Sequence, residues 1–153
     1  MPFDLVLPGA GEEEHLEQAW IFIDSSGSIG DKELTNFLSQ AYTICLANEC
    51  TVNVAYWDTE VTDVYEGIED AEGIAKACPK HSGGTDVRCV FSYIEKNRAK
   101  CRDSVFIICT DGHCGYREHL PVWIKTNTII ALSESGSPDL EGLKANGKLV
   151  DLF

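Results

Sequence analysis

The sequence predicts an α/β fold with a mostly parallel central sheet, one antiparallel edge strand and helices on both faces. Three mainly apolar runs, residues 19–23, 104–109 and 127–132, lack the polar alternation of a half-exposed strand, which suits strands that are covered on both faces. Segments with helical periodicity separate strands along the chain, and that order favours crossover connections in a parallel sheet. With 153 residues and 44% hydrophobic content, the chain is long enough for one well-buried domain and too short for two.

The N-terminal half of the chain predicts an arm, a strand, a helix and a hairpin. Residues 1–18 contain proline, glycine and an acidic run, so we expect a lead-in arm before a domain of residues 19–153. After the first strand, apolar residues three and four positions apart predict a helix over 31–48, with an aspartate as its N-cap. Alternating apolar side chains predict a strand over 51–57, and a short strand over 61–66 should return antiparallel to it.

The C-terminal half predicts further helices between the strands. Residues 70–78 form a weak helical pattern that a proline ends, and a clear apolar stripe predicts a helix over 85–97. The pattern of residues 113–122 is irregular, with at most a helical turn, and residues 133–139 form a loop of serine, glycine and proline. Residues 148–152 predict a last strand at the edge of the sheet. Strands and helices therefore alternate along most of this half.

Short oxygen-bearing side chains follow the carboxyl ends of two apolar strands. Asp24, Ser26 and Ser28 occupy alternate positions directly after the first strand, so their oxygens can converge on one point. Thr85 opens a helical segment, and Asp111 follows the second apolar strand. Such hard oxygen donors suit Mg²⁺ or Mn²⁺, and ligands of parallel sheets bind beyond the carboxyl ends, where the strand order reverses. The alternative is an ordinary loop in which these residues serve only turn and capping chemistry.

Three motifs in a fixed order resemble the metal-ion-dependent adhesion site of von Willebrand factor type A (VWA) and integrin inserted domains. They are Ile-Asp-Ser-Ser-Gly-Ser at 23–28, Gly-Gly-Thr-Asp at 83–86 and Thr-Asp-Gly at 110–112. The resemblance covers residues 19–153 and implies a Rossmann-like fold. Within this group the sequence is most similar to the C-terminal VWA-like domain of predicted metallopeptidase-like bacterial and phage proteins, where an Asp-Thr-Glu-Val segment, here 58–61, also precedes Gly-Gly-Thr-Asp.

The resemblance also implies how the site works. In the family, residues matching Ser26, Ser28 and Thr85 contact Mg²⁺ directly, whereas those matching Asp24 and Asp111 hold it through water. A sixth position is filled by an Asp or Glu of a protein partner. Because neutral hydroxyls leave the cation incompletely neutralised, an incoming carboxylate is strongly attracted. The implied function is cation-dependent protein binding, with no catalytic residue and no organic cofactor.

The charge of the chain limits its partners. The formal net charge is −13, from 25 acidic and 12 basic residues, which opposes nucleic acid or an anionic membrane surface as the main partner. The N-terminus has no basic start followed by a long apolar core, and no apolar run could span a bilayer. We therefore expect a cytoplasmic protein that is monomeric on its own.

The seven cysteines are odd in number and irregular in spacing, which favours reduced thiols over a disulfide framework. Several lie inside apolar helix or strand patterns, where a thiol behaves as a small hydrophobic group. Two Cys–His pairs offer an alternative zinc site, formed by Cys78, His81, His113 and Cys114. Direct adjacency of His113 and Cys114 strains simultaneous ligation, so surface thiols are the expectation for these cysteines.

Two further acids and one enzymatic alternative have open roles. Asp58 either accepts a hydrogen bond near the metal or only starts a hairpin turn, and Asp86 is expected in the first helical turn, where the helix dipole stabilises an acid. A metal-assisted hydrolase could use the same metal ligands. A serine hydrolase would need Ser26 next to a His and an Asp, and the sequence has no Gly-x-Ser-x-Gly elbow. A vestigial metal site in a structural subunit is the third possibility.

Overall fold

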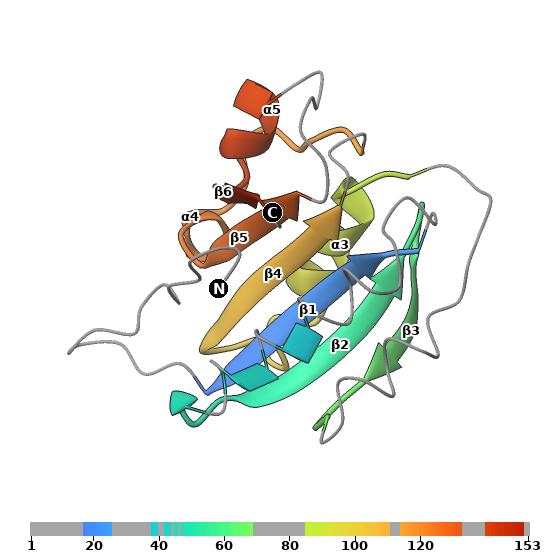
Figure 1. The fold of residues 1–153 in the computed structure, drawn as a ribbon. Coiled ribbons are helices and arrows are strands. Elements are labelled where there is room, and N and C mark those ends of the chain that lie inside the picture. Colours follow the sequence, from blue (N-terminus) through green and yellow to red (C-terminus); the bar gives the residue numbers. More distant parts are fainter. Residues whose placement is uncertain are drawn as a thin grey trace.

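The computed structural model describes residues 17–25, 38–39, 42–43, 45, 47–68, 85–110, 114–132 and 140–151. These residues form a six-stranded sheet with helices on its faces (Figure 1). The strands are β1 Gln18–Asp24, β2 Thr51–Trp57, β3 Val61–Tyr65, β4 Ser104–Thr110, β5 Thr128–Leu132 and β6 Lys148–Asp151. The helices are α3 Arg88–Lys96, α4 Val122–Lys125 and α5 Leu140–Lys144.

The strand order is β3-β2-β1-β4-β5-β6. All neighbouring strands run parallel except β2 and β3, which are antiparallel, so the predicted α/β fold with one antiparallel edge strand is confirmed. The chain moves from β1 to β2 in one direction and returns to place β4 on the other side of β1. The strand order therefore reverses between β1 and β4, as the two loops of the predicted site require.

Side chains of β1 point alternately into two buried clusters, one on each face of the sheet. Trp20 and Phe22 pack with the buried residues of α3, α4 and α5, and α3 lies behind the sheet in Figure 1. Ile21 packs on the opposite face with Leu38 and Cys45, which are helical residues between β1 and β2. Right-handed crossovers that run in opposite directions across a parallel sheet place their helices on opposite faces in this way.

Helix α3 follows the predicted apolar stripe. Its buried side chains are Val90, Phe91 and Ile94, and Val87 before it is also fully buried. The prediction for residues 85–97 is thus correct in type and face, although the helix begins three residues later, at Arg88. These three side chains lie three, four and seven positions after Val87, and that spacing places all four on one face of a helix.

Two short helices were not predicted from the sequence. Irregular structure extends from residue 114 to Pro121, and α4 then adds one turn that the pattern did not predict. The segment after residue 139, for which we made no prediction, contains α5. The predicted helix over 70–78 and the loop over 133–139 lie outside the described residues. No helix in the described ranges is long and apolar enough to cross a membrane.

Candidate functional site

Asp24 lies at the carboxyl end of β1, and only 3% of the residue is exposed. The hydroxyl of Thr110, the last residue of β4, donates a hydrogen bond of 3.2 Å to Asp24 Oδ2. The two side chains join neighbouring strands at the point where the strand order reverses. One predicted metal ligand is therefore held at the edge where ligands of parallel sheets bind.

The loop after β1 is anchored to the end of β2. The backbone nitrogen of Ser25 and its hydroxyl both donate to the carbonyl oxygen of Trp57, at 2.9 Å and 3.0 Å. Ser25 and Trp57 are both fully buried. Ser25 thus serves the backbone of the site, while Ser26 and Ser28, the serines predicted as ligands, lie outside the described residues.

The segment that carries Thr85 is attached to the next residue of the same strand end. The backbone nitrogen of Asp86 donates to the carbonyl oxygen of Asp58 at 2.9 Å. The Asp58 carboxylate accepts the backbone N–H of Glu60 at 2.9 Å, so its side chain forms the turn between β2 and β3, the plainer of its two predicted roles. Because Trp57 and Asp58 are consecutive, the residues that directly follow Asp24 and Thr85 are anchored to neighbouring backbone carbonyl groups.

A third contact brings in the segment after β4. The backbone nitrogen of Val87 donates to the carbonyl oxygen of Cys114 at 2.9 Å. Cys114 is only 2% exposed, so the expectation of a surface thiol is wrong for this residue. Cys114 lies in the loop after β4, and its thiol is buried in the apolar cluster that includes the buried side chains of α3. The other members of the alternative zinc set, Cys78, His81 and His113, lie outside the described residues.

Two of the five predicted ligands lie within the described residues. Asp24 and Thr85 are described, and both belong to segments fixed at the end of β2. Asp111 directly follows Thr110 in the sequence but, like the two serines, lies outside the described ranges. Within those ranges no three His, Cys, Asp or Glu side chains come together to hold a metal. The oxygen chemistry of the described pair, a carboxylate and a hydroxyl, fits Mg²⁺ rather than a softer metal.

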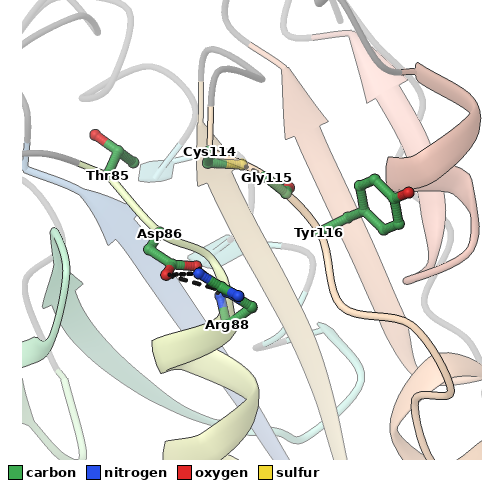
Figure 2. A pocket seen from close by; sticks show the side chains of 6 residues that line it. All are labelled: Thr85, Asp86, Arg88, Cys114, Gly115 and Tyr116. Carbon is green, nitrogen blue, oxygen red and sulfur yellow. Dashed lines mark hydrogen bonds and ion pairs between the residues drawn. The ribbon is translucent and has the colours of Figure 1, made fainter.

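A pocket of about 350 Å³ opens beside Thr85 (Figure 2), and we call it the side pocket. Its lining residues are Thr85, Asp86, Arg88, Cys114, Gly115 and Tyr116. One wall comes from the segment that leads into α3, and the other comes from the loop after β4. Because Thr85 lines the side pocket and is also a predicted metal ligand, the side pocket adjoins the candidate metal site.

An ion pair forms part of the side pocket. Arg88 Nη2 lies 2.7 Å from Asp86 Oδ2, and Arg88 Nε donates to both carboxylate oxygens at 2.9 Å and 3.1 Å. Asp86 Oδ1 also accepts the Arg88 backbone N–H at 3.0 Å. These hydrogen bonds lower the pKa of the Asp86 carboxyl. Asp86 precedes α3 instead of lying in its first turn as expected, yet it still stabilises the start of the helix by accepting an N–H group.

The sequence of this chain was compared with known families. Residues 20–139 match the family model of the VWA-like domain DUF2201. The chain belongs to this VWA-like family. No curated protein matches it.

Solved structures also contain this VWA-like fold. Among them, 57 chains are similar to this protein. One is the structure of three N-terminal domains of the type V pili tip protein Mfa5 from Porphyromonas gingivalis, with 14% identity and a TM-score of 0.50. The alignment covers 81% of this chain but only 24% of the pilus protein. At this identity the likeness concerns the fold alone.

One residue that supports the site of this VWA-like domain has no signal in the sequence. Asn146, fully buried between α5 and β6, accepts from the backbone nitrogen of Arg117 at 3.0 Å and donates to its carbonyl oxygen at 2.5 Å. Arg117 Nη1 also forms an ion pair with Glu95 of α3. The loop that supplies Cys114 and Gly115 to the side pocket is therefore fixed on two sides. Asn146 and Arg117 are 29 residues apart, so no local motif links them.

Proposed function

We propose that this VWA-like domain binds a protein partner through a divalent cation, Mg²⁺ or Mn²⁺. The proposed ligands all carry small oxygen-bearing side chains and are Asp24, Ser26, Ser28, Thr85 and Asp111. The observation that carries the proposal is the hydrogen bond from Thr110 to Asp24, because it joins the first ligand in the sequence, at the end of β1, to the residue directly before the last ligand, at the end of β4. Hydrogen bonds of the neighbouring segments to Trp57 and Asp58 support the inclusion of Thr85.

The donor set favours binding over catalysis. Hydroxyl ligands are neutral, so a cation held mainly by Ser26, Ser28 and Thr85 retains much of its charge and attracts a carboxylate. The partner would supply this group as an Asp or Glu side chain. The proposed ligands include no histidine or other poised base that would activate a nucleophile. A metal-assisted hydrolase is the competing function, and it predicts metal-dependent turnover of generic phosphate or ester substrates.

Calorimetry with Mg²⁺ and Mn²⁺ tests the metal site directly. We expect binding by the wild type, and we expect Thr85→Ala to weaken it at least about tenfold, or about 1.4 kcal/mol, because one ligand oxygen is lost. Thr126→Ala is the matched control, since Thr126 is exposed and its hydroxyl donates to the carbonyl oxygen of Val122 within the α4 segment. Circular dichroism should show an intact fold in both variants.

Several results would contradict the proposed function. Absence of Mg²⁺ and Mn²⁺ binding at millimolar metal, with the fold intact, would remove the metal site. Unfolding of Thr85→Ala would assign Thr85 a structural role instead. Turnover that requires the metal and is lost in Thr85→Ala would replace the binding function with the hydrolase.

A further inference from the structure

We propose that the side pocket receives the uncharged residue of the partner that adjoins the metal-bound acid, with Arg88 donating to that residue's main-chain carbonyl. This inference rests on the proposed function, since the acid places the partner at Thr85. Thr85 is both a proposed metal ligand and a lining residue of the side pocket. A peptide held at the metal by one side chain therefore has its neighbouring residue at the pocket mouth.

Arg88 is oriented for a further acceptor. Its Nε and Nη2 atoms face Asp86, and in the described part of the chain no acceptor is recorded for Nη1. The side chain is 66% exposed, so a ligand can reach it. The guanidinium group is planar and carries five N–H donors in a fixed fork. Fixing one side of the fork on Asp86 directs the remaining donors without further loss of side-chain freedom when a ligand binds.

The charge of this pair favours a neutral acceptor. Asp86 compensates the charge of Arg88 at 2.7 Å, so a second carboxylate gains little local attraction. The whole chain carries −13 and repels additional acids. A main-chain carbonyl has no net charge and still accepts a hydrogen bond from the guanidinium group. The pair therefore suits the backbone of a peptide better than a second acidic side chain.

The opposite wall of the side pocket suits an uncharged side chain. It consists of the buried Cys114, the main chain of Gly115 and the half-buried Tyr116 (Figure 2). A sulfur atom and an aromatic ring both favour apolar or small polar contacts. Peptide recognition commonly combines main-chain hydrogen bonds for affinity with a side-chain pocket for specificity.

A library of random linear peptides displayed on phage provides the probe. The full chain is immobilised in Mg²⁺, and bound phage are eluted with chelator. We expect the selected peptides to share one Asp or Glu and, at a fixed position beside it, an uncharged residue. The synthetic form of the best peptide is then measured by fluorescence anisotropy against wild type and variants.

The variants isolate the side pocket from the metal. Asp86→Asn combined with Arg88→Ala removes the guanidinium donors without changing the net charge. The side-chain oxygen of the asparagine can still accept the backbone N–H of residue 88. Arg88→Lys keeps the charge but loses the fork. Because Arg88 anchors the main-chain carbonyl that places the neighbouring residue in the side pocket, we expect both variants to bind the peptide about tenfold more weakly and to lose the preference beside the acid, while selection for the acid remains. Arg102→Ala, at the amino end of β4, removes an exposed arginine far from the pocket and should change neither.

The outcomes separate this inference from the proposed function. Equal affinity and the same neighbour preference in the Asp86→Asn, Arg88→Ala variant would overturn the side-pocket proposal and leave metal-dependent binding in place. A fixed acidic or basic residue beside the metal-binding acid would overturn it as well, because the side pocket would then recognise a charged side chain. Peptides that share no acid, or that remain bound in chelator, would overturn the proposed function and this inference with it.

Discussion

The position of the Asp24 carboxylate depends on the hydroxyl of Thr110, which is fully buried. Valine has the same shape but no donor, so Thr110→Val removes a hydrogen bond to a carboxylate in a buried setting. Such bonds contribute about 1.5–3 kcal/mol, and we expect the free energy of unfolding to fall by that amount in urea titrations. Loss of an orienting partner of a metal ligand typically weakens metal binding 10–100-fold, so Mg²⁺ affinity by calorimetry should fall by at least about tenfold.

A second buried threonine provides the control for this prediction. Thr128 Oγ1 donates to the carbonyl oxygen of Ile124 at 2.7 Å, far from the candidate metal site. Thr128→Val should therefore cost stability without changing Mg²⁺ affinity. Equal Mg²⁺ affinity in Thr110→Val and the wild type would show that Thr110 does not orient a metal ligand.

Cys45 predicts a pH dependence of stability that can be measured apart from the metal. Burial, reinforced by the neighbouring Cys50 thiol, raises the pKa of Cys45 from 9.0 to about 12. Between these values the unfolded chain loses the thiol proton while the folded chain keeps it, so the free energy of unfolding falls as pH rises. The stability cost of Cys45→Ala relative to the wild type should therefore shrink between about pH 8 and about pH 10.

Leu38→Ala is the control for the thiol, because Leu38 lies in the same buried cluster and has no titratable group. Its cost in urea unfolding should stay constant over this pH range. A cost of Cys45→Ala that is equally constant would mean that the thiol does not titrate differently in the two states.

At the scale of single elements, the strands were predictable and the shortest helices were not. The strands β1, β4 and β5 are apolar on both faces because helices cover both sides of the sheet, and this pattern is visible without neighbours. Helix α4, by contrast, is a single turn whose first residue, Val122, is 74% exposed. Four residues cannot display a helical period, and an exposed valine contradicts the expected buried face.

The positions of candidate residues were predictable next to a strand end, whereas the contacts that fix them to distant partners were not. Asp24 is recognisable because an acid interrupts an apolar run. The contact between Asp24 and Thr110 joins residues 86 positions apart, and the Cys114 carbonyl accepts from the distant backbone N–H of Val87. Such long-range contacts follow from the strand order, so they became visible only with the fold.

Asn146 allows the support of the loop after β4 to be tested. Asn146→Leu removes both hydrogen bonds to the Arg117 backbone. The backbone N–H and carbonyl groups of Arg117 then lose these partners at a partly buried position. We expect a loss of about 2–3 kcal/mol in urea unfolding. Relative to the wild type, the variant should show a larger increase in hydrogen-exchange rate in residues 114–120 than in β1 and β4.

The conservative variant distinguishes the two bonds made by Asn146. Asn146→Asp keeps an acceptor for the Arg117 N–H but loses the donor, and it should lie between wild type and Asn146→Leu in stability. If exchange increases uniformly over the whole sheet in Asn146→Leu, the side chain stabilises the fold generally and does not specifically hold this loop.

At the scale of the whole molecule, the family is informative about the fold, whereas the net charge is informative about the partners. Membership of the VWA-like family accounts for the arrangement of the sheet and helices. The net charge of −13 says nothing about the fold, but it sets which surfaces approach the protein readily. The proposed cation attracts an acid at contact, whereas the whole domain repels acids from a distance. A partner must satisfy both conditions.

The two ranges of attraction predict how a complex with a protein partner depends on salt and on metal. The partner should present one Asp or Glu in an otherwise neutral or basic surface, so that long-range attraction speeds encounter. Stopped-flow association should slow as salt is raised, because screening acts beyond about 10 Å at 0.1 M salt, while the dissociation rate should change little. Chelator should abolish the complex, and replacing the metal-binding acid of the partner by its amide should reduce affinity at least about tenfold, or about 1.4 kcal/mol.

If no single amide substitution has this effect, or if the complex survives chelator, the cation is not the bridge between the two proteins. An association rate that does not change with salt would instead show that the charge of the domain plays no part in encounter.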